Sequence, residues 1–144
     1  MVEPHVYPCR VRWSDIDSYG HVNNVMYFEY FQEARIAFLS GFSRVSGART
    51  LVVARQVVDY KVPMLFRDPA YPIHTWVTRR GTSSFTLTSQ IRDGDRLVAT
   101  AETVIVAFDG DAQRLTTAGR RRGRGARRDA PLTARQVAMA PRAC

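Results

Sequence analysis

Apolar residues recur along this chain with two different periods. Within the segment VMYFEYFQEARIAFLS, at residues 25–40, they return every three to four positions, at Tyr27, Tyr30, Phe31, Ala34, Phe38 and Leu39. This spacing predicts an amphipathic helix. Because further apolar residues fall outside the stripe, we expect other structure to enclose most of the helix. Its more polar side is expected to carry Glu29, Gln32, Glu33 and Arg35.

The period falls to two on either side of the predicted helix. Residues 5–13 (HVYPCRVRW) predict a short strand whose apolar face carries Tyr7, Cys9, Val11 and Trp13. Residues rich in Val, Ile, Thr and aromatics predict four later strands, over 51–62, 73–80, 85–92 and 96–108. In the first of these, strict alternation places Val52, Ala54, Val58 and Tyr60 on one face.

This order of elements predicts an α+β fold. One long central helix packs against one curved, mostly antiparallel sheet of about five strands. The segments 81–84 and 93–95 have the composition of hairpin turns, and the second contains Asp-Gly, a strong hairpin signal. Asn23 or Asn24 is the expected N-cap of the helix, and Gly41 is the residue expected just after its end.

The formal net charge of +8 at pH 7 is concentrated near the C-terminus. Residues 117–144 contain eight arginines and one acid, Asp129, and therefore carry +7 of this charge. Residues 1–116 are left nearly neutral, so we expect one folded domain over 1–116 and a flexible, basic, Arg-rich tail over 117–144. Because the tail has no interleaved aromatic residues, nucleic acid is not the expected partner.

The remaining composition is that of an ordinary globular protein. No apolar run approaches the roughly 18 residues that a membrane span needs, and the first ten residues lack the pattern of a signal peptide. Cys9 and Cys144 lie at opposite ends of the chain, without the spacing of a metal site. We therefore expect a cytoplasmic protein with no membrane span, no disulfide, no metal and no cofactor.

The stretch DIDSYGHVNNVMY, at residues 15–27, is the richest in groups that could carry chemistry. As a calcium loop, Asp15, Asp17 and Gly20 would match positions 1, 3 and 6 of an EF-hand. The match then fails, because Tyr19 stands at position 5 and Met26 replaces the bidentate Glu at position 12. We do not expect this stretch to bind calcium.

Two other interpretations of this stretch stay open on the residues alone. In the structural one, the aspartates make Asx turns, the asparagines cap the helix, and His21 only packs or makes hydrogen bonds. In the catalytic one, free amides at the helix N-terminus polarise a thioester carbonyl, and a nearby carboxylate attacks that carbonyl or activates water. Thioesters suit this simple site because a thiolate leaves easily.

Other hydrolase and nucleotide-binding signatures are missing from the sequence. There is no G-x-S-x-G, no Walker or Rossmann glycine motif and no H-E-x-x-H. A hydratase would need an Asp-His pair in a different motif, and neither His21 nor His74 has that context.

The segment WSDIDSYGHVNNVMYFEYFQEAR, at residues 13–35, resembles the signature of hotdog-fold acyl-CoA thioesterases of the 4-hydroxybenzoyl-CoA thioesterase type. The resemblance continues through 51–64 and 81–109 and covers about residues 5–116. It implies a hotdog fold, in which a long helix is wrapped by a curved antiparallel sheet. It also implies a homodimer or a homotetramer of such dimers, with subunits paired edge to edge, active sites at the dimer interface and an acyl-CoA substrate.

The same resemblance implies roles for individual residues. Asp17, the second acid of the D-x-D, corresponds to the catalytic aspartate, and the amide that polarises the thioester carbonyl falls near Asn24. The residues expected to contact the substrate are Gly20, His21, Val22, Asn23, Tyr27, Arg79, Arg80, Ser83 and Ser84. Tyr27 would line the acyl pocket, and the Arg-Arg and Ser-Ser pairs would meet the phosphates of CoA, with groups of the partner subunit.

This sequence also departs from the family pattern. Family members often have Tyr-Gly-Asp after the strand that ends in proline, whereas Phe66-Arg67-Asp68 stands here, which leaves substrate choice open. Acyl carrier protein thioesters are an alternative substrate. A hotdog module that binds acyl-CoA without hydrolysing it is an alternative function.

Overall fold

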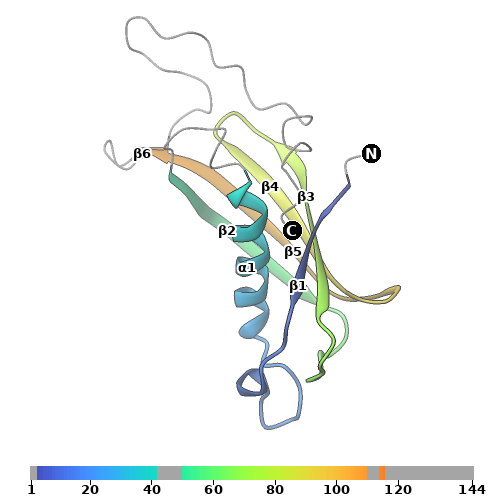
Figure 1. Cartoon of the computed structure of the whole chain (residues 1–144). Coiled ribbons are helices and arrows are strands. Elements are labelled where there is room, and N and C mark those ends of the chain that lie inside the picture. The colour runs from blue at the N-terminus through green and yellow to red at the C-terminus, as the bar shows by residue number, and fades with distance from the viewer. Residues whose placement is uncertain (1–2, 42–49, 110–113, 116–144) are drawn as a thin grey trace, which may run out of the picture.

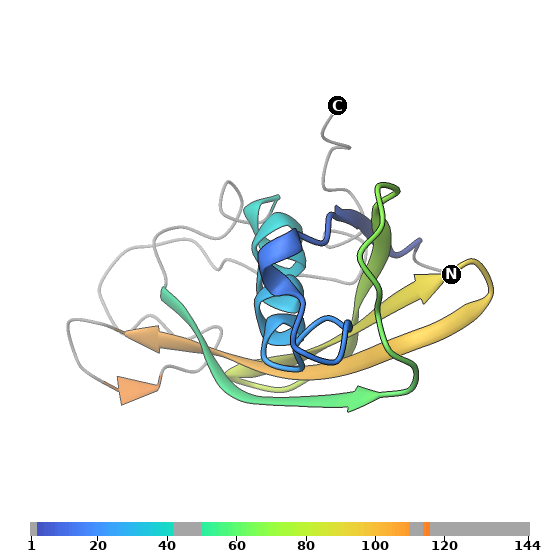
Figure 2. The ribbon, with the colours of Figure 1, turned by 90° about the horizontal axis from the view of Figure 1, so that it is seen from below.

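The computed structural model describes residues 3–41, 50–109 and 114–115 of the 144-residue chain. One helix lies across the concave face of one curved antiparallel sheet, as the two views show (Figures 1 and 2). The elements are β1 (His5–Cys9), the 3-10 turn η1 (Trp13–Asp15), α1 (Met26–Ser40), β2 (Thr50–Tyr60), β3 (Tyr71–Arg80), β4 (Ser84–Asp93), β5 (Arg96–Asp109) and β6 (Arg114–Leu115).

The strand order across the sheet is β1-β3-β4-β5-β2, with the short β6 paired to β5. All of these pairings are antiparallel. The turn between β4 and β5 contains Gly94 at φ 59°, a left-handed conformation that glycine adopts at little cost. The expected α+β hotdog layout is confirmed. The helix and the four longer strands lie close to their predicted ranges, whereas β1 ends at Cys9 and not at residue 13.

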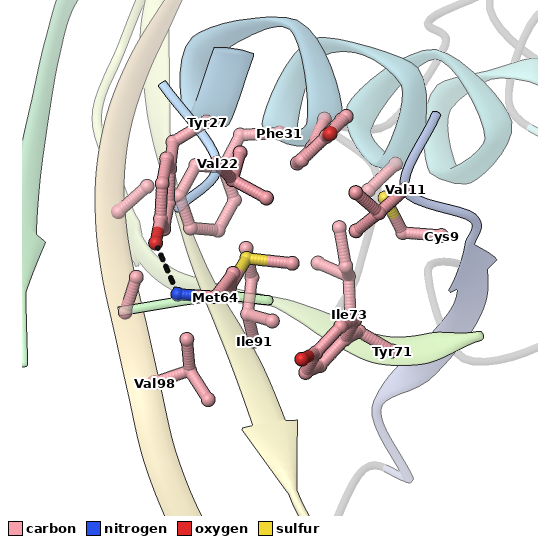
Figure 3. Close-up of a cluster of buried hydrophobic side chains, with 14 residues drawn as sticks. Cys9, Val11, Val22, Tyr27, Phe31, Met64, Tyr71, Ile73, Ile91 and Val98 are labelled. Atoms are coloured by element: carbon pink, nitrogen blue, oxygen red, sulfur yellow. Dashed lines mark hydrogen bonds between the residues drawn. The ribbon is translucent and has the colours of Figure 1, made fainter. Parts of the chain in front are cut away.

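The core lies between α1 and the sheet. Tyr30, Phe31 and Ala34 of the helix pack over Ile73 and Ile91, which come from β3 and β4 (Figure 3). Fully burying an aliphatic or aromatic side chain of this size stabilises the fold by about 1.5–3 kcal/mol, so this layer fixes the helix on the sheet. The Cys9 thiol is fully buried in the same cluster, and burial raises its pKa to about 12.

Three side chains lie elsewhere than the periods predict. Trp13 is 74% exposed, because the extended chain ends at Cys9 and turns through η1 before that tryptophan. Arg35 is only 9% exposed, so the prediction that it lies on the more polar side of the helix was wrong. A register shift between Val53 and Arg55 breaks the alternation of β2 at Ala54.

The helix ends also differ from expectation. Val25 is the N-cap and makes no side-chain capping bond, whereas the Asn23 Oδ1 accepts the Val25 N–H at 3.0 Å in an Asx-type turn just before the helix. Gly41 has φ −65°, so the helix does not end in the left-handed conformation that favours glycine. Neither α1 nor η1, the helices of the described ranges, has the length and apolar character that crossing a membrane requires.

Candidate active site

A tight hairpin precedes α1 and carries the aspartates of the D-x-D motif. Ile16 pairs with Val22 in an antiparallel bridge, and the Asp17 N–H donates to the His21 carbonyl at 2.8 Å. Gly20 turns the hairpin at φ 79°, and it needs no side-chain space, since a Cβ there would meet nothing within 4 Å. Glycine is therefore favoured at this position by its backbone conformation.

The Asp17 carboxylate is held by one oxygen. Its Oδ1 accepts the backbone N–H groups of Tyr19 at 2.9 Å and His21 at 3.4 Å. No hydrogen bond or ion pair among the described residues uses Oδ2. The aspartate is half-buried, so its loop amides fix the carboxylate while one oxygen stays available to another molecule.

The backbone N–H groups between the hairpin and the helix are almost all occupied. That of Val22 donates to the Met64 carbonyl at 2.9 Å, and that of Asn23 to the Asp15 carbonyl at 2.8 Å. The Val25 N–H donates to the Asn23 Oδ1, and the Met26 N–H donates to the Asn23 carbonyl. Within the described part of the chain, the Asn24 N–H alone in this run has no acceptor.

This free amide lies one residue before the N-cap of α1. The N-terminus of a helix carries partial positive charge, which favours a negatively charged oxygen. Asn24 is itself exposed, and its N–H has no acceptor among the described residues. The arrangement is chemically that of an oxyanion site with one backbone donor.

Tyr60, at the end of β2, supports the same peptide from the sheet. Its hydroxyl donates to the Asn24 carbonyl at 3.0 Å, and its ring meets the Tyr27 ring edge-on at a centroid distance of 4.9 Å. Partial burial raises the pKa of Tyr60. The sequence does not single out this residue, because the contact joins segments 36 residues apart.

Asp15, two residues before Asp17, has a different environment. It is 3% exposed, and its Oδ2 accepts the Tyr30 hydroxyl at 2.5 Å and the Arg12 N–H at 3.0 Å. The Arg12 Nε approaches Oδ1 at 3.2 Å. Burial alone would raise the pKa of Asp15, but the bonds from Tyr30 and the backbone and charge of Arg12 outweigh it and hold the pKa below its ordinary value.

Tyr27 and Val22 are buried in the core of this chain. The Tyr27 hydroxyl accepts the Met64 N–H at 3.0 Å, the bond drawn in Figure 3, and burial raises the pKa of this phenol. Val22 packs in the same cluster. His21 and Asn23 are half-buried on the hairpin that carries Asp17, and their contact with a substrate stays a prediction.

Arg79, Arg80, Ser83 and Ser84 lie at the other end of the sheet. They surround the turn between β3 and β4, where the Gly81 N–H donates to the Ser84 carbonyl at 2.7 Å. β3 begins at Tyr71, beside Cys9, and at about 3.3 Å per residue its far end is roughly 30 Å away. In Figure 1 this turn and the Asp17 hairpin lie at opposite ends of α1, so one chain does not bring the two groups together.

No group of three or more His, Cys, Asp or Glu side chains in the described ranges could hold a metal ion. The chemistry that this arrangement offers is a carboxylate and a backbone donor on one short hairpin.

Comparisons with known proteins give this geometry a family. The model described as "Thioesterase-like superfamily" matches residues 11–137. A protein of Aquifex aeolicus named "Putative esterase" is 33% identical over 106 residues, which are 69% of this chain and 81% of that protein. The residues matched by the family model include the hairpin, α1 and the described strands except β1.

Solved structures agree. PA2801, described as a putative thioesterase from Pseudomonas aeruginosa, is 30% identical, with a TM-score of 0.70 over 80% of this chain and 92% of that one. A thioesterase from Thermus thermophilus, solved with coenzyme A and Zn, is 27% identical, with a TM-score of 0.68 over 81% of this chain and 86% of that one. From the family match over most of its length and a helix set across a curved antiparallel sheet, the chain belongs to the thioesterase-like superfamily of hotdog-fold proteins.

Proposed function

We propose that this protein hydrolyses acyl-CoA thioesters to a free acid and a thiol, with Asp17 as the acting carboxylate and the Asn24 N–H as the oxyanion donor. One observation carries the proposal. Among the described residues, the Asp17 Oδ2 on the hairpin and the Asn24 N–H just after the hairpin both lack a hydrogen-bond partner, and both lie at the start of α1. Acyl carrier protein thioesters are the second substrate class to test.

The chemistry follows from these two groups. The thioester carbonyl oxygen accepts the Asn24 N–H, and the charge that develops on it is stabilised at the helix N-terminus. Asp17 then either attacks the carbonyl carbon, expelling the thiolate and forming an anhydride that water opens, or removes a proton from an attacking water. Both routes consume one water and release one acid and one thiol.

A second copy of the chain would complete the site. β2 is the last strand in the sheet order, and its Leu51, Val53 and Tyr60 are exposed, so its edge can pair with another strand. The basic β3–β4 turn is too far from Asp17 in its own chain to share a substrate with it. We therefore propose a homodimer, alone or paired into a tetramer, in which Arg79, Arg80, Ser83 and Ser84 of one copy contact the CoA bound beside Asp17 of the other. Coenzyme A in the related Thermus thermophilus structure supports this ligand class.

The test is thiol release from a panel of acyl-CoA and acyl carrier protein thioesters by the wild type, Asp17→Asn and Asp95→Asn. We expect Asp17→Asn to lower kcat by about 100-fold or more with unchanged thermal unfolding, as loss of a positioned base or nucleophile does. Asp95 is an exposed acid on the β4–β5 turn, so its variant is the matched control. Near-normal turnover by Asp17→Asn would exclude the role of Asp17.

Two further results separate the alternatives. Tight binding of an acyl-CoA without thiol release would identify a binding module in place of a hydrolase. For an active enzyme, a single turnover in heavy-oxygen water distinguishes the two routes, because label that enters Asp17 indicates an anhydride.

A further inference from the structure

Asp15, the first acid of the D-x-D motif, accepts hydrogen bonds at both carboxylate oxygens. Asp17, the second acid, accepts them at only one oxygen within the described chain. We propose that Asp15 is a positioning residue that sets where the Asp17 carboxylate and the Asn24 N–H lie relative to each other. The inference rests on the proposed function and goes beyond it, because it assigns the motif's two acids to two different tasks.

Asp15 is anchored to the helix and to the end of the extended segment before it. Tyr30, which is 1% exposed, donates its hydroxyl to the carboxylate, and Arg12 donates its backbone N–H and its Nε. The Arg12 Nη2 also donates to the Glu29 Oε1 at 2.6 Å. Arg12 is therefore connected to the first half of α1 directly through Glu29, and through Asp15 to Tyr30. Each oxygen of Asp15 is occupied, and the side chain has little freedom to move.

The backbone of Asp15 passes this anchoring to both reacting groups. Its carbonyl accepts the Asn23 N–H at 2.8 Å, and the next peptide N–H along the chain is that of Asn24. Asp17 follows Asp15 by two residues on the same strand of the hairpin, just after Ile16, which bridges to Val22. Asp15 is therefore connected to Asp17 through the chain and to the peptide before Asn24 through a hydrogen bond, so a shift of Asp15 changes the position of Asp17 relative to Asn24.

Asp15 does not itself face a substrate. In an extended segment, residues two apart point the same way, but η1 ends at Asp15, and the side chain of Asp15 is buried whereas that of Asp17 is half-buried. Asp15 is buried with its lone pairs engaged, whereas Asp17 keeps an oxygen without a partner in the described chain. Its effect on the reaction must pass through position.

Tyr30→Phe tests this directly, because it keeps the ring in the core and removes only the hydroxyl that Asp15 accepts. Displacing reacting groups by about 1 Å can cost up to 100-fold in rate, so we expect kcat to fall by about tenfold with KM within about twofold. Tyr7→Phe is the matched control: its hydroxyl also bonds a carboxylate, Glu33, at 3.1 Å, but away from the hairpin. Rates are compared well below the unfolding midpoint of every variant.

A second measurement does not depend on catalysis. Amide hydrogen exchange of Asn23, whose N–H is bonded to the Asp15 carbonyl, should be at least tenfold faster in Tyr30→Phe and in Asp15→Asn than in the wild type or Tyr7→Phe. Unchanged exchange at Asn23, or wild-type kcat in Tyr30→Phe, would overturn the proposal. If the wild type releases no thiol, the proposed function fails, and the exchange experiment still decides whether Asp15 holds the hairpin.

Discussion

Two regions along helix α1 each bury a charged group, and they satisfy it to very different degrees. At the N-terminal end, Asp15 is 3% exposed and takes hydrogen bonds from Tyr30 and from Arg12. Just past the middle of the helix, Arg35 is 9% exposed, and the described residues give its side chain one hydrogen bond, a long one of 3.4 Å to the Gln56 Oε1 on β2.

The difference shows where the described residues offset a buried charge and where they do not. The described residues give Arg35 no ion pair, and the buried Gln56 Nε2 beside it also lacks a partner. Burial accordingly lowers the pKa of Arg35. A buried charge is costly unless hydrogen bonds and an opposite charge offset it. Among the described residues, the helix mouth meets this condition and the region facing β2 does not.

Replacing Asp15 by leucine should have the largest effect on stability. It would leave the Tyr30 hydroxyl and the Arg12 N–H without an acceptor, and breaking a buried charged network costs about 3 kcal/mol or more. Urea unfolding measures the change. A loss below about 1 kcal/mol would mean that the network contributes little to the fold.

The acid limb of the stability curve should follow the same residue. The folded pKa of Asp15 lies below its ordinary value of 3.8, so the folded chain binds fewer protons than the unfolded one. Its contribution to stability is fully present above about pH 3.8 and is lost as the pH falls through the lower folded pKa. Thermal unfolding of Asp15→Asn should therefore depend less on pH than the wild type in this range. Parallel curves for the two proteins would contradict the assignment.

Arg35→Met should have a smaller effect, of opposite sign. The methionine keeps an unbranched apolar stem and removes a buried cation for which the described residues supply no ion pair, so we expect a gain of about 1 kcal/mol in the free energy of unfolding. Arg55→Met is the control, since Arg55 is exposed and pairs with Glu102 at 3.1 Å. A loss of stability that grows with protein concentration would contradict the expectation and would place the acceptors for Arg35 on a second copy.

Tyr7→Phe should have the smallest effect. Its bond to Glu33 is 3.1 Å long and partly exposed, so we expect a loss of about 0.5 kcal/mol. The losses of stability in Tyr7→Phe and Tyr30→Phe together give the difference between a partly exposed and a buried hydroxyl–carboxylate bond on the same helix. Equal losses would remove the contrast on which the comparison rests.

Most of the fold could be predicted from the periods of the sequence. A run of apolar residues at three-to-four spacing became α1, and alternating segments became the long strands, because both patterns report which face is buried. The exceptions depend on tertiary contacts. Trp13 lies beyond a turn that no alternation reveals, Arg35 is enclosed by a strand far along the chain, and the bulge at Ala54 shifts the faces of β2.

The candidate site was predictable in part. Asp17 and Asn24 came from the resemblance to the thioesterase family, since residue types alone left a structural role for the motif open. Their roles stay predictions, although the structure places them on one hairpin. Tyr60 at the Asn24 carbonyl and the different tasks of Asp15 and Asp17 could not be predicted, because each depends on which distant side chain fills the space nearby.

The rate at which the buried Cys9 thiol reacts can report how often this part of the sheet opens. Cys9 faces Tyr71 across the β1–β3 pairing, and with a pKa of about 12 it is protonated and inaccessible in the folded chain. A thiol reagent can modify it only after this sheet edge opens, so in a Cys144→Ser background the labelling rate measures how often β1 detaches. The same property keeps Cys9 silent in an assay that detects thiol products.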